Sequence, residues 1–220
     1  MSKIYEIICD DGVCSECQKY AGKFNEMPKH IPPFHPNCKC KMVEVEEILE
    51  DLFDKLEEHE GGRRNAYTDT KGNVTIGYGS MFNDVEKFKK LSLYYENRLA
   101  TPEEKEAEFY MLRDRKVKMG VLKLQDTEMK ILALEHLNGD LKSVRKKFKD
   151  FDNLPRNAQL VILDMEYNMG GNKFSKNNWP HFFDAINKKD WIWAGNESSS
   201  PDIQLKRNLW RKNMLYSIEE

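Results

Sequence analysis

The sequence has no cysteine after residue 40. All five cysteines of the 220-residue chain precede that point: Cys9, Cys14, Cys17, Cys38 and Cys40. This clustering excludes a disulfide framework for the whole chain and predicts a separate cysteine-built module at residues 1–41. The same segment holds four of the eight prolines and few large apolar residues. Such a segment cannot bury much core, so it needs covalent or metal support if it folds.

The sequence also lacks long apolar runs and an excess of one charge. No run approaches the roughly 20 apolar residues of a membrane span, so we expect no membrane-spanning segment. The chain has 35 basic and 37 acidic residues, and the first 45 residues carry six of each, so we expect no nucleic-acid partner. The N-terminus does not resemble a secretory signal. We therefore expect synthesis in the cytoplasm without a signal peptide.

Residues 42–220 contain enough apolar residues for one domain with a core. Helical spacing is clear over residues 42–60 and ends at Gly61-Gly62. Strand-like residues follow on both sides of Lys71-Gly72-Asn73, which is typical of a hairpin turn. Helical patterns then cover residues 101–118, 127–137, 155–169, 181–187 and 202–216. The first opens with a capping box at Thr101-Pro102-Glu103-Glu104, and the third is apolar nearly all round, as expected for a buried central helix. These patterns predict an α+β fold, with a small β-lobe over 63–82 and a larger all-α lobe.

Two acids and a threonine stand at the change from helix to hairpin. Glycosidic bonds are usually cut by two carboxyl groups, one of which must hold a proton near neutral pH. Glu60 suits that role because it ends a helix, where unpaired carbonyls disfavour a negative charge. Asp69 lies in a polar turn that favours its ionised form, and Thr75 offers a hydroxyl that can hold a water. The spacing therefore indicates a catalytic pair.

The same residues carry a resemblance to a known family. Glu60-Gly61, then Asp69 after eight residues, then Thr75 within Thr75-Ile76-Gly77-Tyr78-Gly79 resemble the bacteriophage-type lysozymes, that is, the T-even phage endolysins of glycoside hydrolase family 24. The resemblance covers about residues 46–216. Its later landmarks are Met165-Glu166-Tyr167-Asn168-Met169-Gly170, Phe174, the Trp191 region and Lys206-Arg207.

This resemblance implies a phage-lysozyme fold for residues 42–220 and a muramidase that acts on peptidoglycan glycan strands. Glu60 would be the general acid, with Asp69 and Thr75 handling the water in an inverting reaction that needs no cofactor. Met81, Tyr167 and Asn177 would line the sugar-binding cleft by position. The enzyme would act on the cell wall, in the periplasm, after release or delivery. The alternative is a structural or binding protein of a phage particle or delivery system, built on a lysozyme scaffold.

The cysteine module has the spacing of a zinc site. Cys14 and Cys17 form a C-x-x-C pair, and His35, Cys38 and Cys40 follow about twenty residues later. A closed tetrahedral site takes four such ligands, so five candidates compete for four places, with His30 a poorer option. We predict a structural zinc. The alternative is that the thiols are free or form disulfides outside the cytoplasm.

The module also resembles the cysteine-rich tail of Mu F-like head-morphogenesis proteins of phages. The shared features are the C-x-x-C pair, Gly22 and the stretch Pro33-Phe34-His35-Pro36 before Cys38. The match is confined to this segment. It implies a phage or prophage product that a particle or delivery partner engages through the N-terminal module.

Overall fold

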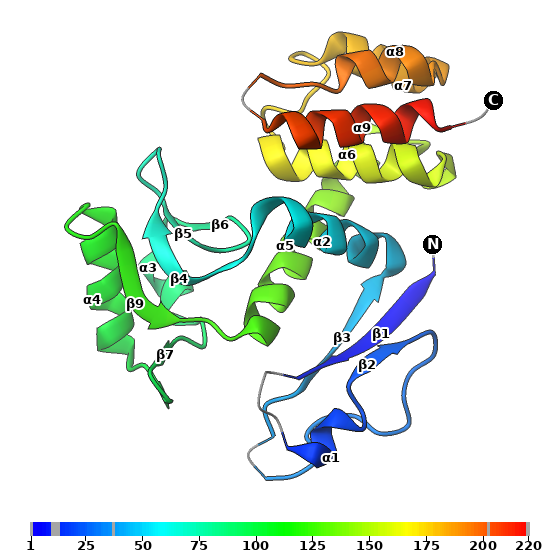
Figure 1. Cartoon of the computed structure of the whole chain (residues 1–220). Helices are drawn as coiled ribbons and strands as arrows, with labels where there is room; N and C mark the ends of the chain where they lie inside the picture. The colour runs from blue at the N-terminus through cyan, green and yellow to red at the C-terminus, as the bar shows by residue number, and fades with distance from the viewer. Residues whose placement is uncertain (1, 10–13, 37, 202, 219–220) are drawn as a thin grey trace. The chain divides into compact units, whose positions relative to one another are not determined.

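The computed structural model describes residues 2–9, 14–36, 38–201 and 203–218, with the side chain of Glu60 also outside the description. The chain forms two compact units, an N-terminal unit, Ser2–Glu135, and a C-terminal unit, His136–Glu220. Strands are confined to the first unit within the described residues, whereas helices occur in both (Figure 1). The mixture confirms the predicted α+β class.

A small antiparallel sheet opens the N-terminal unit. Its strands are β1 (Lys3–Ile8), β2 (Gly22–Phe24) and β3 (Lys41–Glu46), in the order β2-β1-β3, and the short helix α1 (Ser15–Gln18) lies between the first two along the chain (Figure 1). Ile7, Cys17 and Cys40 form its small core. Because β3 pairs with β1 along its whole length, this sheet extends to Glu46. The division at residue 41 stays a prediction.

Helix α2 (Glu47–Glu60) follows directly. It starts later than residue 42, where its helical pattern was predicted to begin, because Met42, Val43 and Val45 are recruited as partners of β1. The predicted apolar face of the helix is confirmed: Ile48, Leu49, Leu52, Phe53 and Leu56 are all buried. The helix ends where expected, since Gly61 adopts a positive φ of 56° that favours glycine.

A six-stranded sheet is the second sheet of this unit. It has the order β6-β5-β4-β9-β7-β8, with β4 (Arg63–Thr68), β5 (Val74–Gly77), β6 (Ser80–Phe82), β7 (Tyr94–Tyr95), β8 (Arg98–Leu99) and β9 (Met119–Lys123). The hairpin predicted over 63–82 is confirmed as β4, β5 and β6. The other three strands were not expected, because two of them are only two residues long and β9 lies between two predicted helices, in a segment to which no element was assigned.

Helix α3 (Val85–Lys89) precedes helix α4 (Pro102–Arg113) in this lobe. The capping box predicted at Thr101 is confirmed, with Glu104 as its partner and Pro102 in the first turn. Helix α4 was expected to reach residue 118, but it ends at Arg113, because the chain must turn back to form β9. The carboxylate of Glu108 fixes that return, since its Oε2 accepts hydrogen bonds from the backbone N–H groups of Val121 (2.7 Å) and Leu122 (2.9 Å).

Helix α5 (Asp126–Lys147) starts in the N-terminal unit and ends in the C-terminal unit. It was predicted to stop near Asn138-Gly139, which is wrong. A glycine inside a helix costs about 1 kcal/mol relative to alanine. Burial of Leu137, Leu141 and Val144 on one face outweighs that cost.

The C-terminal unit is helical throughout the described residues. Helix α6 (Arg156–Met169) is the buried central helix that was predicted, and α9 (Leu205–Tyr216) lies beside it (Figure 1). The 3-10 turn Phe151–Asn153 precedes α6, while α7 (Pro180–Lys188) and α8 (Trp191–Glu197) complete the unit. Asp164 of α6 is fully buried and binds Arg207 (Nη2–Oδ1 2.7 Å) and Arg211 (Nε–Oδ2 2.5 Å) of α9.

Candidate functional site

The end of helix α2 carries the predicted acid. Glu60 is the last helical residue, and the backbone turns at Gly61 before β4 begins at Arg63. The side chain of Glu60 lies outside the described residues, so its predicted role stays a prediction. What the structure provides is the backbone position, at a helix C-terminus where a nearby negative charge is disfavoured.

Asp69 lies in the turn between β4 and β5 and is held by hydrogen bonds. Its Oδ1 accepts from the backbone N–H groups of Lys71 and Asn73, both at 2.8 Å, and its Oδ2 accepts from the side-chain amide of Asn73 at 2.9 Å. Partial burial alone would raise the pKa of Asp69, but these bonds outweigh it and lower the pKa. The carboxylate is therefore ionised near neutral pH and oriented by the turn.

Thr75 lies on the strand that leaves this turn. It is buried, and in the sheet register it stands opposite Tyr67 of β4 and Met81 of β6. Residues directly opposite one another in antiparallel strands direct their side chains to the same face. Thr75 and Met81 therefore share one face of the hairpin, and Met81 is 58% exposed there.

The two other predicted cleft residues belong to the C-terminal unit. Tyr167 lies on α6, half-buried, with its ring 4.9 Å from that of His136. Burial lowers the pKa of His136, so this neighbouring ring is neutral near pH 7. Asn177 is exposed in the turn segment before α7. Asp69, Thr75 and Met81 thus lie in one hairpin, and Tyr167 and Asn177 lie in the second unit.

The phage lysozyme family model matches residues 57–200 of the sequence. The chain belongs to the phage lysozyme family. The match includes Glu60, the whole β4–β6 hairpin and the central helix α6. No curated protein matches the chain.

Membership assigns the chain to a family of peptidoglycan-hydrolysing enzymes, that is, to the glycoside hydrolases at the family level. The matched segment starts in the last turn of α2 and leaves out the N-terminal sheet with its cysteines. None of the described helices of this phage lysozyme combines the length and the apolar character that crossing a membrane requires.

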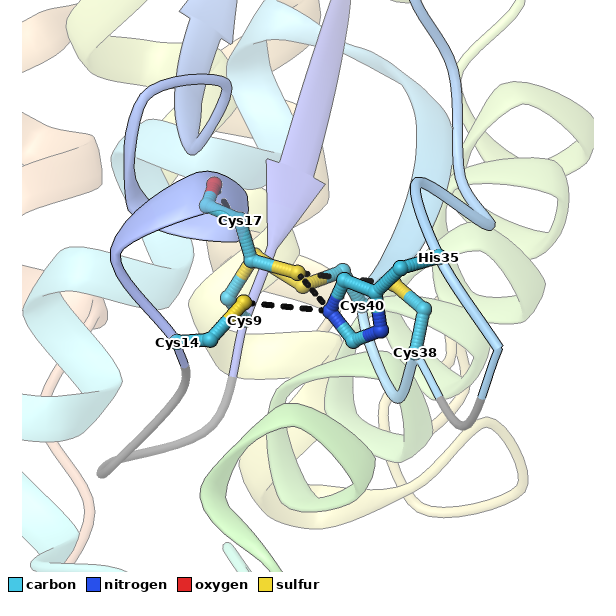
Figure 2. The surroundings of a disulfide bond; sticks show 6 residues. All are labelled: Cys9, Cys14, Cys17, His35, Cys38 and Cys40. Carbon is cyan, nitrogen blue, oxygen red and sulfur yellow. Dashed lines mark hydrogen bonds between the residues drawn. A yellow bond between two sulfur atoms is a disulfide. The ribbon is translucent and has the colours of Figure 1, made fainter.

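The cysteine cluster lies outside the matched segment. Cys17 belongs to α1, and the other members lie in the segments that connect α1 and the strands of the N-terminal sheet. Four of its groups converge: His35 Nε2 lies 3.1 Å from Cys14 Sγ and 3.0 Å from Cys17 Sγ, and Cys17 Sγ lies 3.6 Å from Cys38 Sγ (Figure 2). Cys14, Cys17 and His35 form one group with the separations of metal ligands, and Cys17, Cys38 and Cys40 form a second group that shares Cys17.

Cys40 is held differently from the other predicted ligands. Its sulfur lies near those of Cys17 and Cys38, but it forms a disulfide with Cys9 (Figure 2). This pairing leaves Cys14, Cys17, His35 and Cys38 as the four groups available. Cys9 had no predicted role. Its position, with Cys40, at the two ends of the cysteine cluster was a signal in the sequence, although spacing alone does not assign disulfide partners.

The protonation of the cluster reflects its surroundings. Burial raises the pKa of Cys17 to about 12, and the neighbouring thiols act in the same direction. A hydrogen bond from Cys17's backbone lowers the pKa of Cys14, whereas the carbonyl of Pro36, 2.7 Å from His35 Nδ1, raises the pKa of His35. That carbonyl favours a proton on Nδ1 and leaves Nε2, which faces the sulfurs, as the lone-pair donor that a metal needs.

Proposed function

We propose that the protein is an inverting muramidase that cleaves the β-1,4 bond between N-acetylmuramic acid and N-acetylglucosamine, in the manner of glycoside hydrolase family 24. The observation that carries this proposal is the hairpin: an ionised, oriented Asp69 and a buried Thr75 lie at the turn and the second strand of the hairpin that follows the helix ending at Glu60. Paired carboxyls on either side of a glycosidic bond are what this chemistry requires.

In the proposed mechanism, the Glu60 carboxyl donates its proton to the glycosidic oxygen as the bond to the anomeric carbon breaks. A water held by the hydroxyl of Thr75 attacks that carbon from the opposite face. Asp69 accepts the proton of this water and stabilises the positive charge that develops on the sugar ring. Met81, Tyr167 and Asn177 would contact the glycan.

The test is the clearing of a peptidoglycan suspension by the protein and by Glu60→Gln. Loss of a general acid removes about 10²–10⁴-fold in rate. Glu58→Gln, an exposed neighbour in the same helical turn, is the matched control and should clear at the wild-type rate. Equal rates for wild type and Glu60→Gln would refute the assignment. An inactive wild type that still binds peptidoglycan would favour a binding protein on a lysozyme scaffold.

We further propose that Cys14, Cys17, His35 and Cys38 hold a structural zinc ion. The support is that His35 Nε2 lies 3.1 Å from Cys14 Sγ and 3.0 Å from Cys17 Sγ, and that Cys17 Sγ in turn lies 3.6 Å from Cys38 Sγ. The disulfide occupies the fifth predicted ligand, Cys40. Zinc bound by three thiolates and one imidazole is a closed site with no position for a substrate. The metal would stabilise the N-terminal sheet and take no part in glycan hydrolysis.

Metal analysis of the purified protein tests this site. We expect about one equivalent of zinc in the wild type, since such sites bind zinc tightly, and a loss of zinc and of thermal stability in Cys38→Ser. The double variant Cys9→Ser/Cys40→Ser is the control, because it leaves the four ligands intact and should retain the metal. Retention of zinc by Cys38→Ser would contradict this ligand set.

The resemblance of the module to Mu F-like proteins supports a particle or delivery partner for the enzyme. This partner, and the route by which the enzyme reaches the periplasm, stay predictions.

A further inference from the structure

Tyr78, at the variable position of the T-I-G-x-G run, makes a contact that the proposed mechanism does not use. Its ring is buried, and its hydroxyl donates a hydrogen bond to Glu57 Oε1 at 3.0 Å. Glu57 lies three residues before Glu60, in the last turn of α2. Tyr78 follows Thr75 by three residues, just after β5. The contact therefore joins the helix end to the strand that carries the water-binding threonine.

The ring of Tyr78 also supports the turn that follows Glu60. A Cβ at Gly62 would lie 2.9 Å from Tyr78 Cζ and 2.7 Å from Met129 Cε, so the backbone there packs directly against both side chains. The ring meets Phe53 of α2 edge-on, with centroids 5.1 Å apart. The two glycines after Glu60 thus have different roles. Gly61 allows the positive φ of the turn, and Gly62, which has no Cβ, allows the ring of Tyr78 to approach the backbone closely.

The hydrogen bond matters because packing on this side is incomplete. A cavity of about 480 Å³ is bordered by Glu57, Gly62 and Tyr78, together with residues of β1 and α5. A turn with open space beside it can shift unless a directional contact holds it. Burial, followed by the carboxylate of Glu57, raises the pKa of Tyr78, so its hydroxyl remains a donor across the working pH range.

We propose that Tyr78 and Glu57 form a positioning pair that fixes the last turn of α2, and with it the backbone of Glu60, relative to Thr75 on β5. This inference rests on the proposed function, because it assigns Glu60 the role of general acid. Neither member of the pair is a catalytic residue. Their effect is geometric, and small displacements of a catalytic group are costly in rate.

The test uses Tyr78→Phe, which keeps the ring on Gly62 and removes only the hydroxyl. We expect kcat on peptidoglycan to fall about tenfold while KM changes by less than about twofold, because transition-state geometry is affected more than glycan binding. Glu57→Ala should show the same loss. Glu57→Gln should recover most of the rate, since its amide oxygen still accepts the bond.

A double-mutant cycle separates pairing from general destabilisation. If the two residues act as a unit, Tyr78→Phe/Glu57→Ala should lose no more than either single variant. Glu58→Ala and Tyr110→Phe are matched controls for helix charge and for loss of a tyrosine hydroxyl, and both should keep the wild-type kcat. A wild-type kcat in Tyr78→Phe, or losses that multiply in the double variant, would overturn the pair. An unchanged rate in Glu60→Gln would instead refute the proposed function.

Discussion

At the scale of single residues, the environment of Asp69 decides its chemistry. Carboxylates that accept several N–H bonds are stabilised in the ionised form. Asp69 accepts three such bonds, and Asn73 supplies two of them, one from its backbone and one from its side chain. A substitution of Asn73 can therefore change the pKa of Asp69, the proposed base, while Asp69 itself stays in place.

We expect Asn73→Ala to raise the pKa of Asp69, because it removes the bond to Oδ2 and leaves the backbone bonds in place. Since the mechanism needs the carboxylate, the rate is lost as pH falls through its pKa, and the acidic limb of the pH–rate profile should move to higher pH. The rate near pH 7 should stay within about twofold of wild type.

The measurement is the initial rate of peptidoglycan clearing across the acid range. Thr70→Ala, an exposed change in the same turn, serves as the control and should leave the limb in place. An acidic limb that is unchanged in Asn73→Ala would show that Asp69 is not the group that titrates there.

Much of this local chemistry could be read from the sequence, because the turn that orients Asp69 is encoded within five residues. The partner of Cys40 could not, since five cysteines allow several pairings and only the fold selects one. The contact between Tyr78 and Glu57 was also beyond reach. It joins residues 21 positions apart, through a side chain that periodicity identifies only as apolar.

At the scale of elements, the helices α5 and α6 bury two acids near one another. Asp140 of α5 and Glu166 of α6 are both buried, and Lys147 Nζ contacts Glu166 Oε2 at 2.5 Å. His136 Nε2 lies 3.8 Å from Asp140 Oδ2, which is too far for a hydrogen bond. Burial, followed by the charge of Glu166, raises the pKa of Asp140 to about 7.

The raised pKa gives a stability that depends on pH. Asp140 has an ordinary pKa of 3.8 and a folded-state pKa of about 7. At pH values between these two, Asp140 is protonated in the folded state and ionised in the unfolded state. Stability is therefore lost as pH rises through this window, and the penalty is complete above it. We expect Asp140→Asn to be more stable than wild type near pH 8 and to show no such gain near pH 4.

Thermal unfolding at the two pH values measures this effect. Asp184→Asn is the control, because it makes the same change of charge at a half-exposed position of α7, where Asp184 pairs with Lys176 near the surface. An equal shift in melting temperature at both pH values would mean that the titration of Asp140 is not its cause.

Helix α5 also shows where sequence patterns fail at this scale. A glycine after an asparagine is a common helix end, and the prediction that α5 stops there rested on this signal. The apolar side chains on both sides of Gly139 continue on one face, however, and their burial depends on packing partners elsewhere in the chain. The strands β7 and β8 were missed for a related reason. A two-residue strand has no sequence pattern of its own and is defined only by its pairing with neighbouring strands, here β7 with β8 and β9.

At the scale of the whole molecule, the N-terminal sheet is joined to helices α2 and α5 by ion pairs around a buried glutamate. Glu50 of α2 is only 2% exposed, and its Oε2 contacts Lys23 Nζ of β2 at 2.9 Å and Lys130 Nζ of α5 at 3.0 Å. Lys130 also binds Glu6 of β1 at 2.6 Å. Burial alone would raise the pKa of Glu50, but the two lysines outweigh it and lower the pKa.

We expect Glu50→Gln to destabilise the protein by about 1.5–3 kcal/mol at neutral pH, the range for a lost hydrogen bond to a charged group. Because the pKa of Glu50 is lowered, its contribution is present above the ordinary value of 4.5 and is lost as pH falls. Denaturant unfolding at pH 7 and near pH 3 tests both statements.

Glu44→Gln is the matched control, since Glu44 pairs with Lys3 at the surface. Exposed pairs contribute less than about 1 kcal/mol. Equal losses in the two variants would mean that the buried network does not join the sheet to the helices.

The bond between Cys9 and Cys40 encloses a loop that contains every proposed zinc ligand and four prolines. A protease that cut this loop once would release no fragment, because the covalent bridge would still hold the two pieces. The nicked chain would run as one species on a non-reducing gel and separate into two only after reduction. An enzyme exposed to the proteases of a bacterial envelope would thus keep its leading segment attached after a first cleavage.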